Sequence, residues 1–411
     1  MAEIPQLYVI GLLPDQGWLS PAVASLIEGA DVLAGGDRLL EMFPSHTGEK
    51  LSLTTPLEGW LNQLRDLQGQ GRRVVVLASG DPNYFGIAKK LLTVIDKEHV
   101  TIVPTVSTVQ QAFARLKVSY ERAEVVSMHG REAKVAFWAG LYRVSHFEGS
   151  GYLAVYTDAE NSPSVIAKRL LGRGQQNWRM HVFEDLGTQD ERVTSWSLYE
   201  AKLRKFSPLN LVILECLRRP ASISLGMPEG AYVHEAGLIT KREVRVVTLG
   251  LLELLSHHTM WDLGAGSGSV SIEAAALLPY GSVWSVEKSP LRTEQISANR
   301  AFFGAAQVEI VEDEAMSAMA HLPTPDRIFI GGGGTGLSSI IPVAAARLNS
   351  EGIMVVNAVS LDNFQTARES MKKAGLDVTV TQIQVARSEP LAESAYLKPL
   401  NQVWLVRGVK S

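Results

Sequence analysis

The ten residues from Trp261 to Val270 constrain the fold of this chain more than any other stretch. They read W-D-L-G-A-G-S-G-S-V, an apolar run that passes through three alternating glycines into a second segment with apolar residues. Glycine has no Cβ atom, so this spacing lets a ligand approach the backbone closely. The pattern predicts a buried strand, a tight turn and a helix whose free N–H groups face the turn. We therefore expect an open α/β sheet with a ligand at this turn.

The turn departs from G-x-G-x-x-G, the sequence that binds dinucleotides. Its third glycine comes one residue early, and Asp262 adds a carboxylate beside the turn. A dinucleotide places its pyrophosphate on the helix N-terminus, whereas an acidic group suits the cationic sulfonium of S-adenosylmethionine (SAM). Glu287 ends the next predicted strand, where a carboxylate can accept hydrogen bonds from a ribose diol. We interpret the segment as the SAM site of a Rossmann-like methyltransferase; the alternative is a glycine turn without a ligand.

Length and composition limit the possible functions further. A chain of 411 residues is too long for a typical single core and suggests two domains. The net charge of −4 argues against a nucleic-acid partner, and the single cysteine, Cys216, cannot form an internal disulfide. We see no signal peptide and no apolar run of membrane-spanning length. We therefore expect a cytoplasmic protein without a nucleic-acid or membrane partner.

The first half carries three short loops, each after a predicted apolar strand. The loops are Gly11–Asp15, Ser79–Pro82 and Pro104–Thr108. In an open α/β sheet, ligands bind beyond the carboxyl ends of the strands, which is where these loops lie. The Gly-Asp-Pro sequence at residues 80–82 is, taken alone, typical only of a tight turn. The combination of the three loops is more specific than any one of them.

Together these loops resemble those of the tetrapyrrole methylases, a second and unrelated class of SAM enzymes. The resemblance implies that the cofactor contacts are Pro14, Asp81, Tyr84, Ser107 and Thr108. Two loops depart from the family pattern, because Leu13-Pro14-Asp15 lacks a second glycine and Thr105 replaces a glycine. His129 and Arg131 either face the carboxylates of the substrate, with the arginine as a planar fork, or belong to a surface turn.

The second half resembles a different family, the domain of cobalamin biosynthesis that methylates carbon 15 and decarboxylates its substrate. The similar segments are I-T-K-R-E-V-R at 239–245, D-L-G-A-G-S-G at 262–268, V-E-K-S-P at 286–290 and I-G-G-G-G at 330–334. The resemblance implies a second SAM site with contacts from Thr240, Gly264, Ala265, Gly266, Ser267, Gly268, Glu287 and Ala315.

Two features of this half can be interpreted without the resemblance. Thr240 and Glu243 have the spacing of a capping box, with Thr240 as the N-cap of a helix. Gly332 and Gly333 lie in a run of four glycines after a predicted central strand. They either let a planar substrate approach the backbone or form a mobile loop.

The two halves, in this order, resemble bifunctional precorrin-6B (precorrin-6Y) carbon-5 and carbon-15 methyltransferases. We predict a tetrapyrrole methylase fold of two α/β subdomains over residues 1–215, a linker over 216–235, and a Rossmann-like class I SAM methyltransferase fold over 236–411. The resemblance implies SAM-dependent methylation of precorrin-6B at carbons 5 and 15, with decarboxylation of the ring C acetate to give precorrin-8. It also implies two SAM sites and a homo-oligomer. Whether the substrate carries cobalt, as in the anaerobic pathway, stays open.

The same motifs leave two other functions open. A methyltransferase that acts on RNA or protein uses the same folds, although the acidic net charge and the absence of a recognition domain count against it. A SAM-sensing or scaffold protein could hand tetrapyrroles between enzymes without catalysis. For the enzyme we expect no metal and no acid–base set, because SAM carries an activated methyl group and the protein mainly aligns the reactants. The sequence therefore identifies no catalytic residue.

Overall fold

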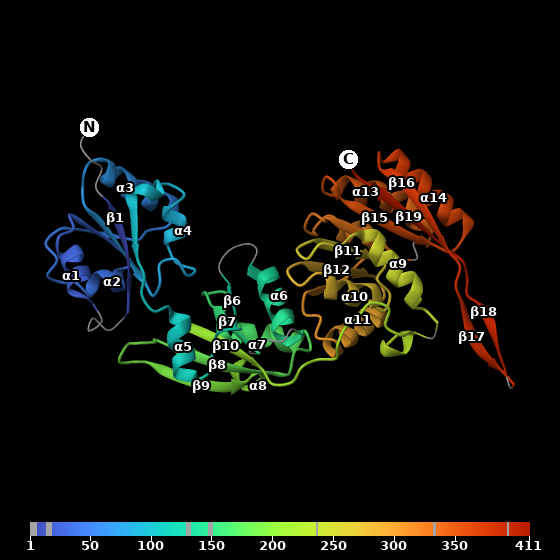
Figure 1. The fold of residues 1–411 in the computed structure, drawn as a ribbon, viewed down its shortest axis with the longest axis horizontal. Helices are drawn as coiled ribbons and strands as arrows, with labels where there is room; N and C mark the ends of the chain where they lie inside the picture. The colour runs from blue at the N-terminus through green and yellow to red at the C-terminus, as the bar shows by residue number, and fades with distance from the viewer. Residues whose placement is uncertain are drawn as a thin grey trace.

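The computed structural model describes residues 6–13, 19–128, 133–146, 151–235, 237–331, 334–392 and 394–411. These residues form three α/β units, which follow one another in chain order in Figure 1. The first two units make up the N-terminal half, and the third is the C-terminal half. The predicted α/β fold, with two subdomains in the first half, is therefore confirmed. Among the described residues, no helix is both long and apolar enough to cross a membrane.

The first unit is a five-stranded parallel sheet in the order β3-β2-β4-β1-β5. Its strands are β1 (Leu7–Leu12), β2 (Val32–Gly35), β3 (Glu49–Ser52), β4 (Val74–Ser79) and β5 (Val100–Val103). Its helices are α1 (Pro21–Glu28), α2 (Asp37–Glu41), α3 (Leu57–Gly69) and α4 (Ala88–Leu91). The central strand β4 is buried from Val74 to Ala78 because helices cover both faces of the sheet.

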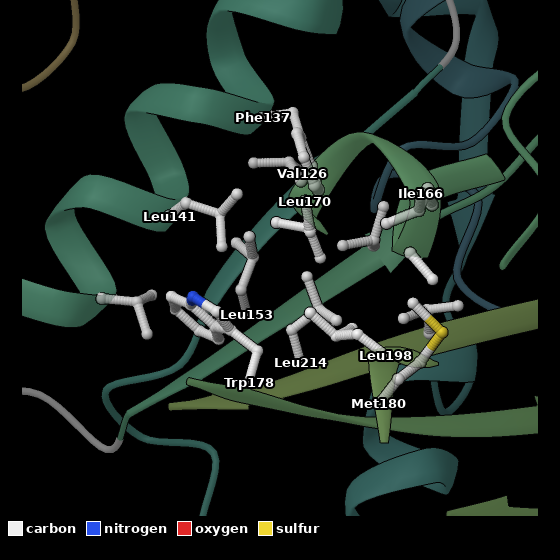
Figure 2. Close-up of a cluster of buried hydrophobic side chains, with 14 of the residues drawn as sticks. Val126, Phe137, Leu141, Leu153, Ile166, Leu170, Trp178, Met180, Leu198 and Leu214 are labelled. Atoms are coloured by element: carbon white, nitrogen blue, oxygen red, sulfur yellow. The ribbon is translucent and has the colours of Figure 1, made fainter. Parts of the chain in front are cut away.

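The second unit is a mixed sheet in the order β6-β7-β10-β8-β9. Its strands are β6 (Glu124–Ser127), β7 (Tyr152–Tyr156), β8 (Trp178–Glu184), β9 (Arg192–Ser197) and β10 (Asn210–Cys216). Its helices are α6 (Ala133–His146), α7 (Pro163–Gly172) and α8 (Leu198–Ala201). Figure 2 shows Phe137 and Leu141 of α6 packed with Leu170 of α7 over Leu153 and Leu214 of the sheet. The helix α5 (Thr108–Leu116) follows β5 but packs on the other face of this second sheet, so it joins the two units.

The C-terminal half is a seven-stranded sheet in the order β13-β12-β11-β14-β15-β19-β16. Its strands are β11 (Thr259–Leu263), β12 (Ser282–Glu287), β13 (Val308–Glu312), β14 (Arg327–Ile330), β15 (Ile353–Ala358), β16 (Asp377–Ile383) and β19 (Val403–Val409). In this sheet β19 alone runs opposite to the other six strands. The strand order reverses between β11 and β14, and ligands of open α/β sheets bind at such a switch point.

Helices cover both faces of this sheet, so its central strands β11, β14 and β15 are largely buried. One face carries α9 (Arg242–Leu252), α10 (Ser269–Leu277) and α11 (Pro290–Phe302). The other carries α12 (Ala315–Ala318), α13 (Leu337–Arg347) and α14 (Leu361–Lys373). Between β16 and β19 the strands β17 (Ala386–Leu391) and β18 (Ser394–Pro399) pair with each other and extend away from the body of the protein (Figure 1). We call this ribbon the arm.

The start of α9 differs from the prediction. The helix begins at Arg242 with Lys241 as its N-cap, and no side chain caps it. The Glu243 carboxylate instead accepts hydrogen bonds from the Arg387 guanidinium, at 3.1 Å from Nε and 2.6 Å from Nη2. The predicted capping box between Thr240 and Glu243 is wrong, because an arginine of the arm takes the carboxylate that the box requires.

The segment between the halves, residues 216–235, is anchored to the C-terminal half by the buried carboxylate of Glu273. The Glu273 oxygens accept from the backbone N–H groups of Gly226 and Met227, at 2.9 and 3.0 Å, and from the Tyr232 hydroxyl at 3.0 Å. The Arg245 Nε donates to the same carboxylate at 2.7 Å, and both charged side chains are 0% exposed. This network binds the segment, helix α9 and helix α10 to one another.

The second unit also contacts the C-terminal half directly. Arg143 of α6 donates from Nη1 to the carbonyl oxygen of Pro279 at 2.8 Å. Arg173, just after α7, forms an ion pair with Glu309 of β13. Ala306 of the C-terminal half belongs to the same hydrophobic cluster as the side chains in Figure 2. The two halves therefore share polar contacts and a small apolar seam.

Candidate active sites

The turn after β11 has the backbone conformation that its glycines predict. Gly264, Gly266 and Gly268 have φ angles of 76°, 58° and 77°, values that favour glycine. A Cβ atom on Gly264 would lie 2.7 Å from the carbonyl oxygen of Gly331, whereas one on Gly266 would meet no protein atom within 4 Å. The turn is therefore closed against β14 at Gly264 and open at Gly266.

Two cavities flank this turn and share Gly264, Arg292 and Gly331 in their walls. The acidic cavity, of about 390 Å³, lies beyond β12 and β13 and is lined by Glu287, Asp313, Glu314 and Ala315, among others. The large cavity, of about 610 Å³, lies beyond β11 and β15, on the side of the predicted site residues Thr240, Ala265, Gly266 and Ser267. The predicted SAM turn therefore separates an acidic compartment from a larger one.

Glu287 ends β12, as predicted, and lines the acidic cavity. Its Oε2 accepts from the Gly266 N–H at 2.9 Å, and its Oε1 accepts from the Ser289 N–H at 3.0 Å. These two bonds fix the carboxylate between the turn and the cavity. A carboxylate held at the end of the second strand is the acceptor that a ribose diol requires.

Asp262 lies beneath the turn, and the described residues that line the two cavities do not include it. Its side chain is completely buried, and its Oδ2 accepts from the Ser271 hydroxyl at 2.5 Å. Burial raises the pKa of this carboxyl to about 7, although the Ser271 bond opposes the shift, and the charge of Glu287 adds to it. Its direct contact with a ligand stays a prediction.

We expect Asp262→Asn to change how stability depends on pH. The folded pKa of about 7 exceeds the ordinary value of 3.8, so between these values the unfolded chain has lost a proton that the folded chain retains. The free energy of unfolding of the wild type should therefore fall as the pH rises through this interval and stay low above it. Asparagine does not titrate. In thermal scans without ligand, the difference between the Tm of the variant and that of the wild type should therefore rise, in favour of the variant, from pH ~4 to ~7. A Tm difference that is independent of pH would contradict the raised pKa.

The three predicted loops of the first half meet at one edge of the first sheet. A Cβ atom on Gly11 would lie 2.5 Å from the carbonyl oxygen of Gly80 and 2.9 Å from Thr105 Cγ2. The Gly80 N–H donates to the carbonyl oxygen of Leu12 at 2.9 Å. A Cβ atom on Gly80 would lie 3.2 Å from the Thr108 hydroxyl oxygen. The structure thus brings the three loops together, and Gly11 has no room for a side chain between them.

Two of the predicted cofactor contacts have local partners that shape these loops. Asp81 Oδ1 accepts from the Asn83 N–H at 2.9 Å, which holds the tight turn. The buried Ser107 hydroxyl caps α5 in a capping box with Gln110. Tyr84 is partly exposed, and its ring centroid lies 5.3 Å from that of Phe85. Contact between these side chains and a cofactor stays a prediction.

Tyr156, at the end of β7, lies beside these loops and was not identified from the sequence. Its ring centroid lies 5.4 Å from that of Phe85. Burial, together with the neighbouring Tyr84 and Asp81, raises the pKa of Tyr156 to about 12. A neutral tyrosine from the second unit therefore faces the loops of the first. No motif marks it, because β7 comes close to these loops only in the folded protein, where α5 packs on the second sheet.

Five predicted site residues, Pro14, His129, Arg131, Gly332 and Gly333, lie outside the described residues. Among the residues that are described, no three His, Cys, Asp or Glu side chains are grouped so that they could hold a metal ion.

Comparison with known proteins identifies the family of each half. Residues 6–202 match the family model of tetrapyrrole (corrin/porphyrin) methylases, and residues 230–410 match that of the precorrin methyltransferase domain. A precorrin-6Y C(5,15)-methyltransferase (decarboxylating) of Sinorhizobium sp. is 34% identical over 401 residues, which cover 96% of this chain and 94% of the relative. The chain belongs to the family of decarboxylating precorrin-6Y C(5,15)-methyltransferases. It is therefore a methyltransferase that uses SAM, as predicted.

Two shorter relatives each match about half of this chain. A probable cobalt-precorrin-6B C(15)-methyltransferase (decarboxylating) of Pyrobaculum calidifontis is 37% identical over 184 residues, 44% of this chain and 94% of the relative. A cobalt-precorrin-7 C(5)-methyltransferase of Salmonella typhimurium is 33% identical over 188 residues, 46% of this chain and 88% of the relative. Relatives of each half thus also occur as separate chains.

Proposed function

We propose that this protein methylates precorrin-6B (precorrin-6Y) at carbons 5 and 15 and decarboxylates its ring C acetate, giving precorrin-8 for cobalamin biosynthesis. The observation that carries the proposal is the match of nearly the whole chain to a relative with both activities. We assign carbon-5 methylation to residues 1–215, and carbon-15 methylation with decarboxylation to residues 236–411. Residues 216–235 connect the two parts.

Each half would bind its own SAM molecule. In the C-terminal half, the acidic cavity suits the adenosine, with Glu287 at the ribose and Ala315 at the adenine. The open backbone at Gly266 suits the methionine part, since no protein atom occupies the space in front of it. In the N-terminal half, the loops around Gly11, Asp81 and Thr108 would hold the second SAM.

The large cavity suits the tetrapyrrole substrate. Among the described residues that line it there is no aspartate or glutamate, so the carboxylates of a precorrin meet no like charge there. SAM supplies an activated methyl group when it is bound, and the transfer needs no acid or base from the protein. The residues of the cavity would hold the accepting carbon in line with the methyl group and exclude water, effects that contribute about 7–11 kcal/mol in well-oriented reactions.

A direct assay tests this proposal. Purified protein is incubated under inert gas with SAM and metal-free precorrin-6B, and the product is weighed by mass spectrometry. We expect two added methyl groups and the loss of one carboxyl group. No product from this substrate, with turnover of the cobalt-containing form, would assign the protein to the anaerobic route. Methylation of tRNA or rRNA alone would overturn the proposal.

Asp81→Ala tests the assignment of carbon-5 methylation to the first half. The variant loses the bond that holds the tight turn at Asn83, which we expect to lower the rate of carbon-5 methylation about tenfold, the effect of ~1.4 kcal/mol. Carbon-15 methylation and decarboxylation should keep their rates. Asp96→Ala, an exposed aspartate of the same unit, is the control and should change neither rate. Loss of both activities in folded Asp81→Ala protein would contradict independent sites.

We further propose that the protein is a homo-oligomer that associates through the arm. Leu391 and Leu397 of the arm are 58% and 70% exposed, and an isolated two-stranded ribbon is only marginally stable in water. Leu391→Ser combined with Leu397→Ser should therefore lower the molar mass measured by light scattering to that of one chain. Leu203→Ser, an exposed leucine of the second unit, is the control and should leave the mass unchanged. A monomeric wild type would overturn this proposal.

A further inference from the structure

The large cavity offers few groups that can release a proton at neutral pH. The described residues in its lining include no aspartate, glutamate, histidine, cysteine or tyrosine. Its polar side chains are the hydroxyls of Thr240, Ser267 and Ser269, the amides of Asn357, Asn363 and Asn401, and the cations Lys241 and Arg292. Hydroxyl and amide groups are too weakly acidic, and an arginine guanidinium does not lose its proton in proteins. Within the described lining, the ammonium of Lys241 is the one remaining proton donor.

Lys241 has a fixed backbone and an ammonium without a partner among the described residues. The preceding residue, Thr240, accepts at its carbonyl oxygen from Arg245 Nη1 at 2.6 Å, and Arg245 is itself held by the buried Glu273. The other cation of the cavity differs, because Arg292 donates from Nε to Glu235 at 2.9 Å. Lys241 is thus the free positive charge in the described wall of the cavity.

The position of this charge is unfavourable for the helix that follows. Lys241 is the N-cap residue of α9, and the positive end of a helix dipole disfavours a cation there by about 0.3–1 kcal/mol. Neither a salt bridge nor helix stability therefore accounts for a lysine at this place. A negatively charged ligand in the cavity would account for it.

The proposed decarboxylation needs a proton. The bond between the acetate methylene carbon and the carboxylate carbon breaks, and its electron pair moves into the conjugated macrocycle as CO₂ leaves. The pair then returns to the methylene carbon, which takes up one proton and becomes a methyl group. No oxidant or reductant is involved, but a proton donor has to face the ring C side chain.

We propose that Lys241 is this proton donor, an inference that rests on the proposed function of the C-terminal half. Its Nζ gives a proton to the methylene carbon, and the neutral amine regains one from solvent, since the side chain is half-buried rather than enclosed. A permanent pair with the departing carboxylate is the less suitable role, because it would stabilise the group that has to leave. Apolar side chains such as Val244, Phe329 and Val403 line the same cavity and disfavour an ionised carboxylate without a partner.

Two substitutions separate proton donation from charge. Lys241→Met removes both, whereas Lys241→Arg keeps the charge and removes the transferable proton. Single-turnover reactions with SAM and precorrin-6B are followed by mass spectrometry, so methyl gain and carboxyl loss are counted separately. We expect decarboxylation to slow by about 10²–10⁴-fold in both variants, the usual contribution of general acid catalysis, while carbon-15 methylation stays within about tenfold of the wild type. Lys373→Met, an exposed lysine at the end of α14, is the control.

The outcomes distinguish the role of Lys241 from the proposed function itself. If Lys241→Arg decarboxylates at the wild-type rate and only Lys241→Met is slow, the residue binds the substrate by charge and the proton-donor role is wrong. If both variants decarboxylate normally, Lys241 has no part in this step. A wild type that neither methylates carbon 15 nor decarboxylates would instead overturn the proposed function. Wild-type decarboxylation that slows as the pH is raised, with no such fall in Lys241→Met, would support the proton-donor role.

Discussion

Gly266→Val is expected to reduce carbon-15 methylation and decarboxylation by at least a hundredfold, while carbon-5 methylation continues at its normal rate. No protein atom lies within 4 Å of the position that a Cβ atom on Gly266 would take, so the valine would fill the place proposed for SAM without pushing neighbouring elements apart. A loss of about 2.7 kcal/mol in binding or alignment corresponds to a hundredfold lower rate. The measurement is the mass of the product, which distinguishes one added methyl group from two.

A matched control separates ligand exclusion from backbone strain. Gly266 has a φ of 58°, where a valine is strained whatever space it has. Gly375 has a φ of 80° and also no atom within 4 Å of its Cβ position, but it follows α14 and lines neither cavity. Gly375→Val should therefore show the cost of strain with both activities intact. If it lost carbon-15 methylation as fully as Gly266→Val, strain rather than ligand exclusion would explain the effect.

The sequence predicted the structural features that depend on the spacing of residues within one short segment. The alternating glycines at 264, 266 and 268 predicted a tight turn between a buried strand and a helix, and the sequence before residue 80 predicted an apolar strand. Such features depend on steric freedom and burial within one short segment, so they can be inferred without knowing the fold.

Features that depend on partners distant in the chain were not predicted. Tyr156 reaches the loops of the first unit because α5, which follows one of these loops, packs on the second sheet. The capping box at Thr240 was wrong because Arg387, 144 residues from Glu243, takes its carboxylate. The buried carboxylate of Asp262, beneath the turn, accepts a hydrogen bond from Ser271 on the next helix. In each case a tertiary contact decides the role of a residue that its local sequence does not determine.

Glu273→Ala should destabilise the C-terminal half by about 3–5 kcal/mol, the usual cost of leaving one member of a buried ion pair without its partner. The substitution leaves the Arg245 guanidinium charged and 0% exposed, and it frees the N–H groups of Gly226 and Met227. The chain has several units, so a single unfolding transition is not expected. Amide hydrogen exchange of residues 216–235 and of α9 measures the effect locally, and both should lose protection together.

An exposed ion pair in the same half provides the control. Glu253 pairs with Arg407 at 2.7 Å, but its side chain is 61% exposed, so Glu253→Ala should cost less than ~1 kcal/mol. Glu273→Gln keeps the shape and one acceptor oxygen, and we expect an intermediate loss of protection. Because Arg245 also holds the carbonyl oxygen of Thr240, Glu273→Ala should slow the carbon-15 reactions by displacing Lys241 from the large cavity. If amide protection in Glu273→Ala stayed within ~1 kcal/mol of the wild type, the buried network would not be what anchors the segment between the halves. The position of Lys241 would then have to be fixed by other contacts.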